Sequence, residues 1–210
     1  MARLLYIEAS PRKNRSASIE VSHAFLQAYR DHHPADQIET LDIWAERYPE
    51  FDGAAMAAKY AGIEGVALTA EQATTWDNIR GLAAPFLAAD KLLLSVPLWN
   101  FGIPYRLKHL IDLITHKDIL FAFDGKGFQG LLKARKAAVV YARGLDYGVD
   151  GSTPAALFDF QKPYVEAWLR LVGVAEIYSV TVEKTLFGPE VDGAGRAVAK
   201  QAAAILATNF

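Results

Sequence analysis

The sequence predicts a doubly wound α/β fold, in which helices cover both faces of a sheet of parallel strands. Two observations favour this class. Short apolar runs alternate along the chain with segments whose apolar residues recur every three or four positions, as in strands joined by helices. The central runs are continuously apolar, as expected for strands covered on both faces. The chain has 210 residues, 52% of them hydrophobic, which is enough for one substantial core. We therefore expect a single domain over residues 1–210.

Five segments are expected to form the strands of this sheet. The continuous apolar runs lie at residues 4–7, 91–96 and 137–142, and we place them at its centre. The runs at 38–43 and 176–182 are shorter or alternating, which favours positions nearer the edges. A count of five parallel strands suits the order 2-1-3-4-5 that flavodoxin-like proteins adopt.

Three segments between the strands have the spacing of amphipathic helices. Their apolar residues lie at positions 21, 24, 25 and 28, at 107, 110, 111 and 114, and at 165, 168, 169 and 172. Two other segments are longer than the fold needs. Residues 44–69 are expected to carry a short helix on an extended excursion. Residues 116–129 have the pattern of a hairpin, in which Phe121 and Phe123 alternate before a DGKG turn. Excursions of this size usually serve a site or a partner.

The loop after the first strand has the features of a phosphate site. It reads SPRKNRSAS over residues 10–18 and lies where doubly wound sheets bind ligands. The hydroxyls of Ser10, Ser16 and Ser18 and the free N–H groups at the start of the next helix form a cup of donors. The glycine patterns for triphosphates and for dinucleotides are both absent. A single terminal phosphate, as in flavin mononucleotide (FMN), fits this loop. An ordinary capped turn with solvated basic residues is the alternative.

A second loop, SVPLWNFGIP over residues 95–104, offers walls for a flat heteroaromatic ring. Pro97 ends a strand because it has no N–H group, and Pro104 is expected to be the first residue of a helix. Leu98, Trp99, Asn100 and Phe101 stand between these prolines, at the carboxyl end of a central strand. Core packing of the aromatic residues is the alternative interpretation.

These motifs together resemble the family of FMN-dependent NADH azoreductases and quinone reductases. That family carries an S-P-R…S-x-S loop and a P-x-x-N-F-x-x-P loop before a helix with L-K-x-x-I-D. The corresponding strings here are SPR with SAS, then PLWNFGIP followed by LKHLID. Further on, FDGKGFQGLLKARKA is similar to the family's aromatic hairpin and its approach to the fourth strand. The resemblance covers most of the chain and implies a flavodoxin-like fold that binds FMN.

The resemblance also assigns roles to individual residues. It implies that three loops hold the cofactor: Ser10, Ser16, Ala17 and Ser18 the phosphate, Leu98, Trp99, Asn100 and Phe101 the ring, and Arg143 and Gly144 the third loop. The family's third loop reads S-R-G-G, whereas this chain has ARGL at 142–145, so that a serine and a glycine are missing. Tyr147 is a candidate substitute for the lost serine. The hairpin's Phe121, Phe123 and Phe128 are expected to contact substrate over the flavin, or else to pack locally. No side chain is assigned as a catalytic group.

The implied activity is that of an FMN-dependent oxidoreductase. NADH or NADPH would deliver hydride to the flavin, and a quinone or an azo compound would then take the same place, with ping-pong kinetics. The resemblance further implies a homodimer in which both subunits bound each active site. A flavin reductase, a flavodoxin-like electron carrier and a non-catalytic module with an eroded third loop remain as alternatives.

Composition excludes several other classes. The 22 basic and 24 acidic residues leave a net charge of −2, so no basic field for nucleic acid is expected. With no cysteine, disulfides, thiolate catalysis and cysteine-bound metals are excluded. His109 and His116 have no third partner at ligand spacing, so no metal site is expected. The first apolar run is too short for a signal peptide or a membrane span, and we expect a cytoplasmic protein with no membrane contact.

Overall fold

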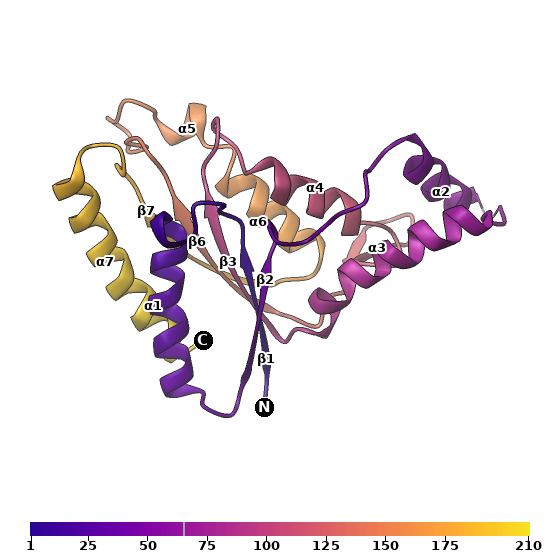
Figure 1. The fold of residues 1–210 in the computed structure, drawn as a ribbon, viewed down its shortest axis with the longest axis horizontal. Helices are drawn as coiled ribbons and strands as arrows, with labels where there is room; N and C mark the ends of the chain where they lie inside the picture. Colours follow the sequence, from indigo (N-terminus) through magenta and orange to yellow (C-terminus); the bar gives the residue numbers. More distant parts are fainter. Residues whose placement is uncertain (65) are drawn as a thin grey trace.

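The computed structural model describes residues 1–64 and 66–210, and within them a five-stranded parallel sheet forms the centre of the fold (Figure 1). Its strands are β1 (Arg3–Glu8), β2 (Gln37–Asp42), β3 (Lys91–Pro97), β6 (Lys136–Ala142) and β7 (Glu176–Val182). They lie in the order β2-β1-β3-β6-β7, and every pair is parallel. The predicted fold class and strand order are confirmed.

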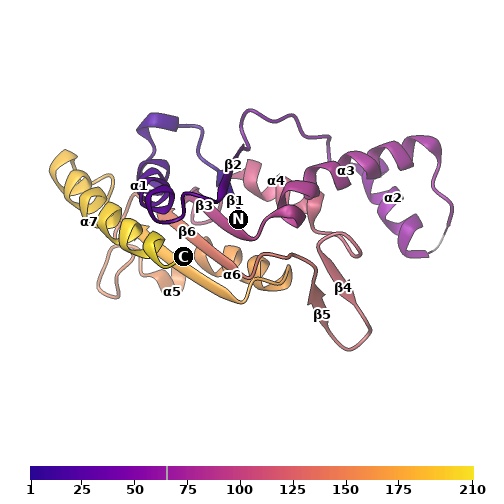
Figure 2. The ribbon, with the colours of Figure 1, turned by 90° about the horizontal axis from the view of Figure 1, so that it is seen from below.

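Helices cover both faces of this sheet, which explains the continuous apolar runs. On one face lie α1 (Ala17–His32) and α7 (Pro189–Thr208), and on the other lie α3 (Ala70–Ala88), α4 (Tyr105–Ile114) and α6 (Lys162–Leu171) (Figures 1 and 2). Successive residues of β1 contact opposite cores: Leu4 and Tyr6 pack against α1, and Leu5 and Ile7 pack on the other side. Both sets are buried, so no polar face is left on the strand.

The helices predicted from the apolar spacing around residues 21–28, 107–114 and 165–172 are confirmed as α1, α4 and α6. Two long helices, α3 and α7, were not predicted. Alanine is common in both α3 and α7, and in α3 the three-and-four spacing is also weak. A capping box starts α3: the Thr69 hydroxyl accepts from the Gln72 N–H at 3.2 Å, and the Gln72 side chain accepts from the Thr69 N–H at 2.9 Å. Pro104 is the residue before α4 rather than its first residue. None of the described helices is long and apolar enough to span a membrane.

Both excursions form the predicted kind of structure. The first carries α2 (Gly53–Glu64), which packs against α3 at the far end of the molecule from α7 (Figure 2). The second is an antiparallel hairpin of β4 (Phe121–Phe123) and β5 (Phe128–Gly130). In its turn the Asp124 carboxylate accepts N–H groups from Lys126 at 2.8 Å and Gly127 at 2.9 Å.

Candidate functional site

The opening loop places three serine hydroxyls at the start of α1. A short 3-10 turn, Lys13–Arg15, precedes Ser16, which is the N-cap of the helix. Ser10, Ser16 and Ser18 are all buried, and the Oγ atoms of Ser16 and Ser18 lie 3.1 Å apart. The Ser16 side chain makes no capping hydrogen bond. Because the first N–H groups of a helix have no intrahelical partner, this loop keeps free donors beside its hydroxyls.

Lys13 anchors the loop to the sheet. Its Nζ lies 2.5 Å from Oδ1 of Asp42 at the end of β2 and 3.2 Å from Oε2 of Glu8 at the end of β1. Burial disfavours the charge, but the hydrogen bonds to the two carboxylates prevail and raise the pKa of Lys13. Its backbone lies in the left-handed region, with φ at 48°. The two ion pairs therefore hold a conformation that an isolated lysine disfavours.

The second loop is a tight two-residue turn. The N–H of Trp99 donates to the Gly102 carbonyl at 3.0 Å, and the N–H of Gly102 donates back to the Trp99 carbonyl at 2.9 Å. Asn100 and Phe101 between them have φ angles of 46° and 69°. Positive φ at both central residues is the conformation of a type I′ turn, which normally takes Asn-Gly. A phenylalanine in the second position is strained, and such strain is common at ligand sites.

Neighbouring segments hold this strained turn. The N–H of Phe160 donates to the Phe101 carbonyl at 2.9 Å, and the Phe101 ring lies 5.1 Å from that of Phe158. On the other side the Trp99 ring lies 5.8 Å from the ring of Trp44, whose indole N–H donates to the Ala9 carbonyl at 3.1 Å. Trp44 therefore joins the first excursion to the loop after β1 and to the Trp99 turn. Its role was not predicted, because nothing in the local sequence of the excursion points toward the turn.

Arg143 holds the third loop through a buried cluster. Its guanidinium donates to Asp159 at 2.5 Å, to Glu183 at 3.2 Å and to the amide of Gln161 at 3.2 Å. Only 5% of its surface is exposed. Tyr147 lies under the same guanidinium, with its ring centroid 4.9 Å away, and is itself buried. Tyr147 is thus part of the Arg143 cluster and is not among the residues that line the neighbouring pocket.

The three loops meet in a pocket of about 160 Å³ at the carboxyl ends of β1, β3 and β6. Seven of the ten predicted cofactor residues line it: Ser10, Ser16, Ala17, Leu98, Trp99, Arg143 and Gly144. The other three lie beside it. Ser18 is buried behind Ser16, and Asn100 and Phe101 form the tip of the turn.

The loop after β7 and helix α7 add residues that were not predicted. Thr185 and Leu186 donate their N–H groups to the carbonyls of Arg143 at 3.2 Å and Gly144 at 3.1 Å, and both line the pocket. A Cβ on Gly144 would lie 2.7 Å from Cδ1 of Leu186, so this position accepts only glycine without a shift. Arg196 of α7 also lines the pocket. No local motif marks these residues, because α7 itself was not predicted.

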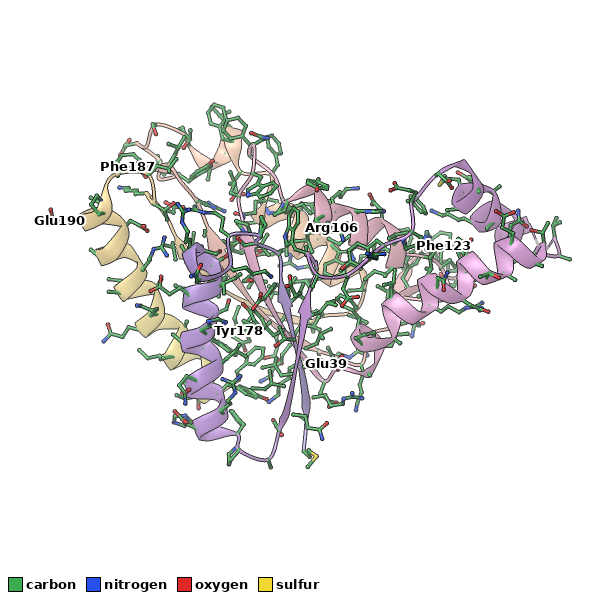
Figure 3. The ribbon with its side chains drawn as sticks, viewed as in Figure 1. Glu39, Arg106, Phe123, Tyr178, Phe187 and Glu190 are labelled. Carbon is green, nitrogen blue, oxygen red and sulfur yellow. The ribbon has the colours of Figure 1, made fainter. Side chains whose placement is uncertain are left out.

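A different pocket, of about 400 Å³, lies between the hairpin and the packed helices α2 and α3, here called the α2–α3 arm. It is lined by Phe121, Phe123 and Phe128. Figure 3 shows Phe123 beside α3, at the opposite end of the molecule from Phe187 and Glu190, which follow Leu186. Among the described residues, none of the hairpin lines the pocket at the three loops. Within one chain, therefore, the hairpin does not cover the predicted flavin site.

The two histidines considered as metal ligands lie apart. The ring of His109 packs 5.9 Å from Tyr48, whereas the ring of His116 lies between Phe51 and Trp76. Within the described part of the chain, no group of three His, Cys, Asp or Glu residues could hold a metal ion.

Comparison with known proteins agrees with this geometry. A family model described as a flavodoxin-like fold matches residues 2–206. The FMN-dependent NADH:quinone oxidoreductase 9 of Burkholderia lata is 62% identical over 189 residues, which is 90% of each chain. The FMN-dependent NADH:quinone oxidoreductase 3 of Pseudomonas fluorescens is 50% identical over all of this chain and 98% of its own.

Solved structures give the same result. A crystal structure of an azoreductase from Bacillus anthracis aligns over the whole of both chains with a TM-score of 0.89 and 28% identity. A second structure from that organism is an FMN-dependent NADH-azoreductase in complex with FMN. It aligns over 98% of this chain and 99% of its own, with a TM-score of 0.82 and 26% identity.

Proposed function

This chain belongs to the flavodoxin-like family whose model matches residues 2–206, and on that premise we propose that it is an FMN-dependent oxidoreductase that uses NADH to reduce quinones or azo compounds. One observation carries the proposal: the serine cup at the start of α1 and the strained Trp99 turn open into the same pocket. The two features are the ones that a phosphate and a flat ring require.

The residues of the cup fit a single phosphate group. Three buried serine hydroxyls and the free N–H groups at the start of α1 supply neutral donors. These donors can bind one phosphate group without a glycine-rich loop. Arg12 and Arg196 line the same pocket and add positive charge. The charge of Arg196 is shared with Asp192 and Glu20, each 2.7 Å away, so the serines and amides carry most of the recognition.

Bound FMN supplies the hydride chemistry, and the chain supplies binding and orientation. Leu98 and Trp99 offer an apolar wall for the ring, while the backbone of the 99–102 turn and of Gly144 offers polar groups for its edge. Because tertiary contacts hold the turn from both sides, it is organised before the cofactor binds. No side chain is assigned a nucleophilic or acid–base role.

We infer that a second copy of the chain completes the acceptor site. The hairpin does not reach the pocket at the three loops of its own chain, and Phe128, which flanks the hairpin turn, is 65% exposed. An exposed aromatic hairpin of this kind suits a position over the flavin of a partner in a homodimer. Sedimentation that gives a monomer at micromolar concentration would contradict this part. The cytoplasmic location stays a prediction.

The cup is tested by comparing FMN with riboflavin, which lacks the phosphate. We expect FMN to bind to the apoprotein at least about 100-fold more tightly than riboflavin. The double variant Ser16→Ala/Ser18→Ala should lose FMN affinity and keep that for riboflavin. Ser22→Ala is the matched control, since Ser22 is buried in the same helix outside the pocket. Equal binding of both flavins to the native protein would overturn the proposal.

The reaction is tested with the reconstituted protein. NADH should bleach the flavin, and a quinone should restore its colour. Parallel lines in a two-substrate initial-velocity plot are expected if both substrates use one place in turn, and intersecting lines would contradict that mechanism. A protein that binds FMN but shows no NADH-dependent quinone reduction would instead be an electron carrier.

A further inference from the structure

The side chain of Lys13 lies outside the pocket at the three loops, although its backbone belongs to the opening loop. It lines a separate hollow beside the first turns of α1, together with Glu8, Asn14 and His23. The residues that line this hollow and those that line the pocket at the three loops form two sets with no member in common. Lys13 is therefore placed to act on the loop from behind, without contact to a ligand in the pocket.

The two carboxylates that Lys13 meets stand side by side. The parallel pairing of β1 and β2 places Glu8 directly beside Asp42, at the carboxyl ends of both strands. Two like charges in neighbouring positions of a sheet repel each other, so this pair needs a cation. The Lys13 ammonium lies 2.5 Å from Oδ1 of Asp42 and 3.2 Å from Oε2 of Glu8. His23 also faces Glu8, with Nε2 3.8 Å from Oε1, but 61% of its side chain is exposed. The sheet therefore fixes the position of the lysine ammonium.

The backbone of Lys13 joins this fixed ammonium to the serine cup. The Lys13 carbonyl accepts the N–H of Ser16 at 2.9 Å, and Ser16 is the N-cap of α1. The N–H of Arg15 closes the same turn by donating to the Arg12 carbonyl at 2.9 Å. With φ at 48°, Lys13 has a conformation in which residues other than glycine are strained. Without the ion pairs, we expect this segment to relax and the Ser16 hydroxyl to leave the cup.

We propose that Lys13 is a positioning residue for the cofactor phosphate. Its ion pairs with Glu8 and Asp42 hold the opening loop in the conformation that gathers the serine donors before a ligand binds. The proposal rests on the proposed function, since the cup is the part of the site that would take the FMN phosphate. A loop that is already in place loses less conformational freedom on binding, so the affinity for the phosphate rises.

Replacing Asp42 by asparagine separates this role from simple attraction of charge. If Lys13 acted only through its charge, removing the nearby anion would leave more positive potential and strengthen the binding of a phosphate dianion. If the ion pairs hold the loop, the same change weakens that binding. Asparagine keeps an oxygen that can accept the N–H of Trp44, which lies 3.0 Å from Oδ1 of Asp42, so the contacts of Trp44 near the Trp99 turn are retained.

Affinities for FMN and for riboflavin are measured on the apoprotein by quenching of flavin fluorescence. We expect Asp42→Asn to weaken FMN binding about three- to fivefold and Lys13→Met about tenfold, with riboflavin changed by less than about twofold. Lys13→Gly also lacks the charge, but glycine adopts a positive φ without strain. It should therefore bind FMN at least about threefold more tightly than Lys13→Met does.

Glu39→Gln is the matched control for Asp42→Asn. Glu39 is another carboxylate of β2, and it pairs with Arg3 of β1 at 3.5 Å, with about half of each side chain exposed. The substitution removes the same charge from the same strand without touching the opening loop. It should change neither the FMN affinity nor the riboflavin affinity by more than about twofold.

Trypsin digestion of the apoprotein tests the loop without any flavin. Arg15 is exposed and precedes the buried Ser16, so cleavage between them needs the loop to open. Asp42→Asn keeps every trypsin site of the loop, and we expect it to speed this cleavage about three- to fivefold. Cleavage after the exposed Arg170 of α6 is the internal reference, because a general loss of stability would speed both.

The proposal is overturned if Asp42→Asn binds FMN as tightly as the native protein or more tightly, or if it leaves the cleavage after Arg15 unchanged. It is also overturned if Lys13→Gly and Lys13→Met bind FMN equally weakly, since loss of charge alone then accounts for both. These failures leave the proposed function intact. A native protein that binds FMN no better than riboflavin overturns the proposed function, and with it the role of Lys13 toward the phosphate.

Discussion

Replacing Arg143 by methionine tests how the loop at residues 142–145 is held. Methionine keeps an unbranched side chain of moderate length and removes the charge and all the donors. In the native protein the guanidinium donates to Asp159, Glu183 and Gln161, and both Arg143 and Asp159 are almost fully buried. The variant leaves the Asp159 carboxylate without its cation in a site with little access to water.

The expected cost follows from these contacts. Removing one member of a buried ion pair costs about 3–5 kcal/mol, because the remaining charge stays desolvated and unpaired. Glu183 is 29% exposed on its side chain, so it regains water and adds little to this figure. We therefore expect Arg143→Met to lower the free energy of unfolding by about 3–4 kcal/mol, a large share of the 5–15 kcal/mol typical of a domain.

Urea unfolding of the apoprotein, followed by far-UV circular dichroism, measures this cost. Arg170→Met is the matched control: Arg170 is 62% exposed, pairs with Glu166 at 3.5 Å and should lose no more than about 0.5 kcal/mol. In the double variant Arg143→Met/Asp159→Asn the unpaired charge is gone, so part of the loss should be recovered. A cost for Arg143→Met as small as that of the control would refute the buried-cluster interpretation.

Three further changes follow from particular contacts. Gly130→Ala places a Cβ 2.1 Å from the backbone N of Gly173, so we expect it to lower the free energy of unfolding by about 3 kcal/mol or more. In the control Gly127→Ala, in the same hairpin, the new Cβ meets nothing within 4 Å, so the free energy of unfolding should change by no more than about 0.5 kcal/mol. Tyr141→Phe removes a buried hydroxyl that has no hydrogen-bond partner among the described residues, and it should raise the free energy of unfolding by about 1 kcal/mol; a loss of stability would contradict this. His116 has a folded pKa of about 4 against 6.5 for the free side chain, so the unfolded state takes up the proton first and native stability falls as the pH drops from 6.5 to 4. The free energy of unfolding relative to His116→Phe should fall by up to about 3 kcal/mol over that range, and a constant difference between the two proteins would contradict it.

The sequence by itself determined the central sheet and the two loops that open into the pocket. Each central strand is covered by helices on both faces, so its residues form a continuous apolar run that is visible in the sequence. The opening loop was predicted because serines at a helix start and the end of strand one are neighbours in the chain. The loop around Trp99 was predicted for the same reason, since its prolines and aromatic residues lie close together in the sequence.

Only the tertiary structure decided what these loops contact. Arg143 meets Glu183, which is 40 residues away, and Trp44 donates to Ala9, which is 35 residues away; neither pairing has a local signature. The aromatic hairpin was recognised from its alternation, but its position against α3 depends on two packed excursions. The apolar pattern of a strand or helix and the residues of a loop are local features of the sequence. The partner that a side chain contacts across the core depends on which distant elements pack beside it. That is why the loops at residues 10–18 and 95–104 followed from the sequence, and the buried Arg143 cluster and the pocket around His116 did not.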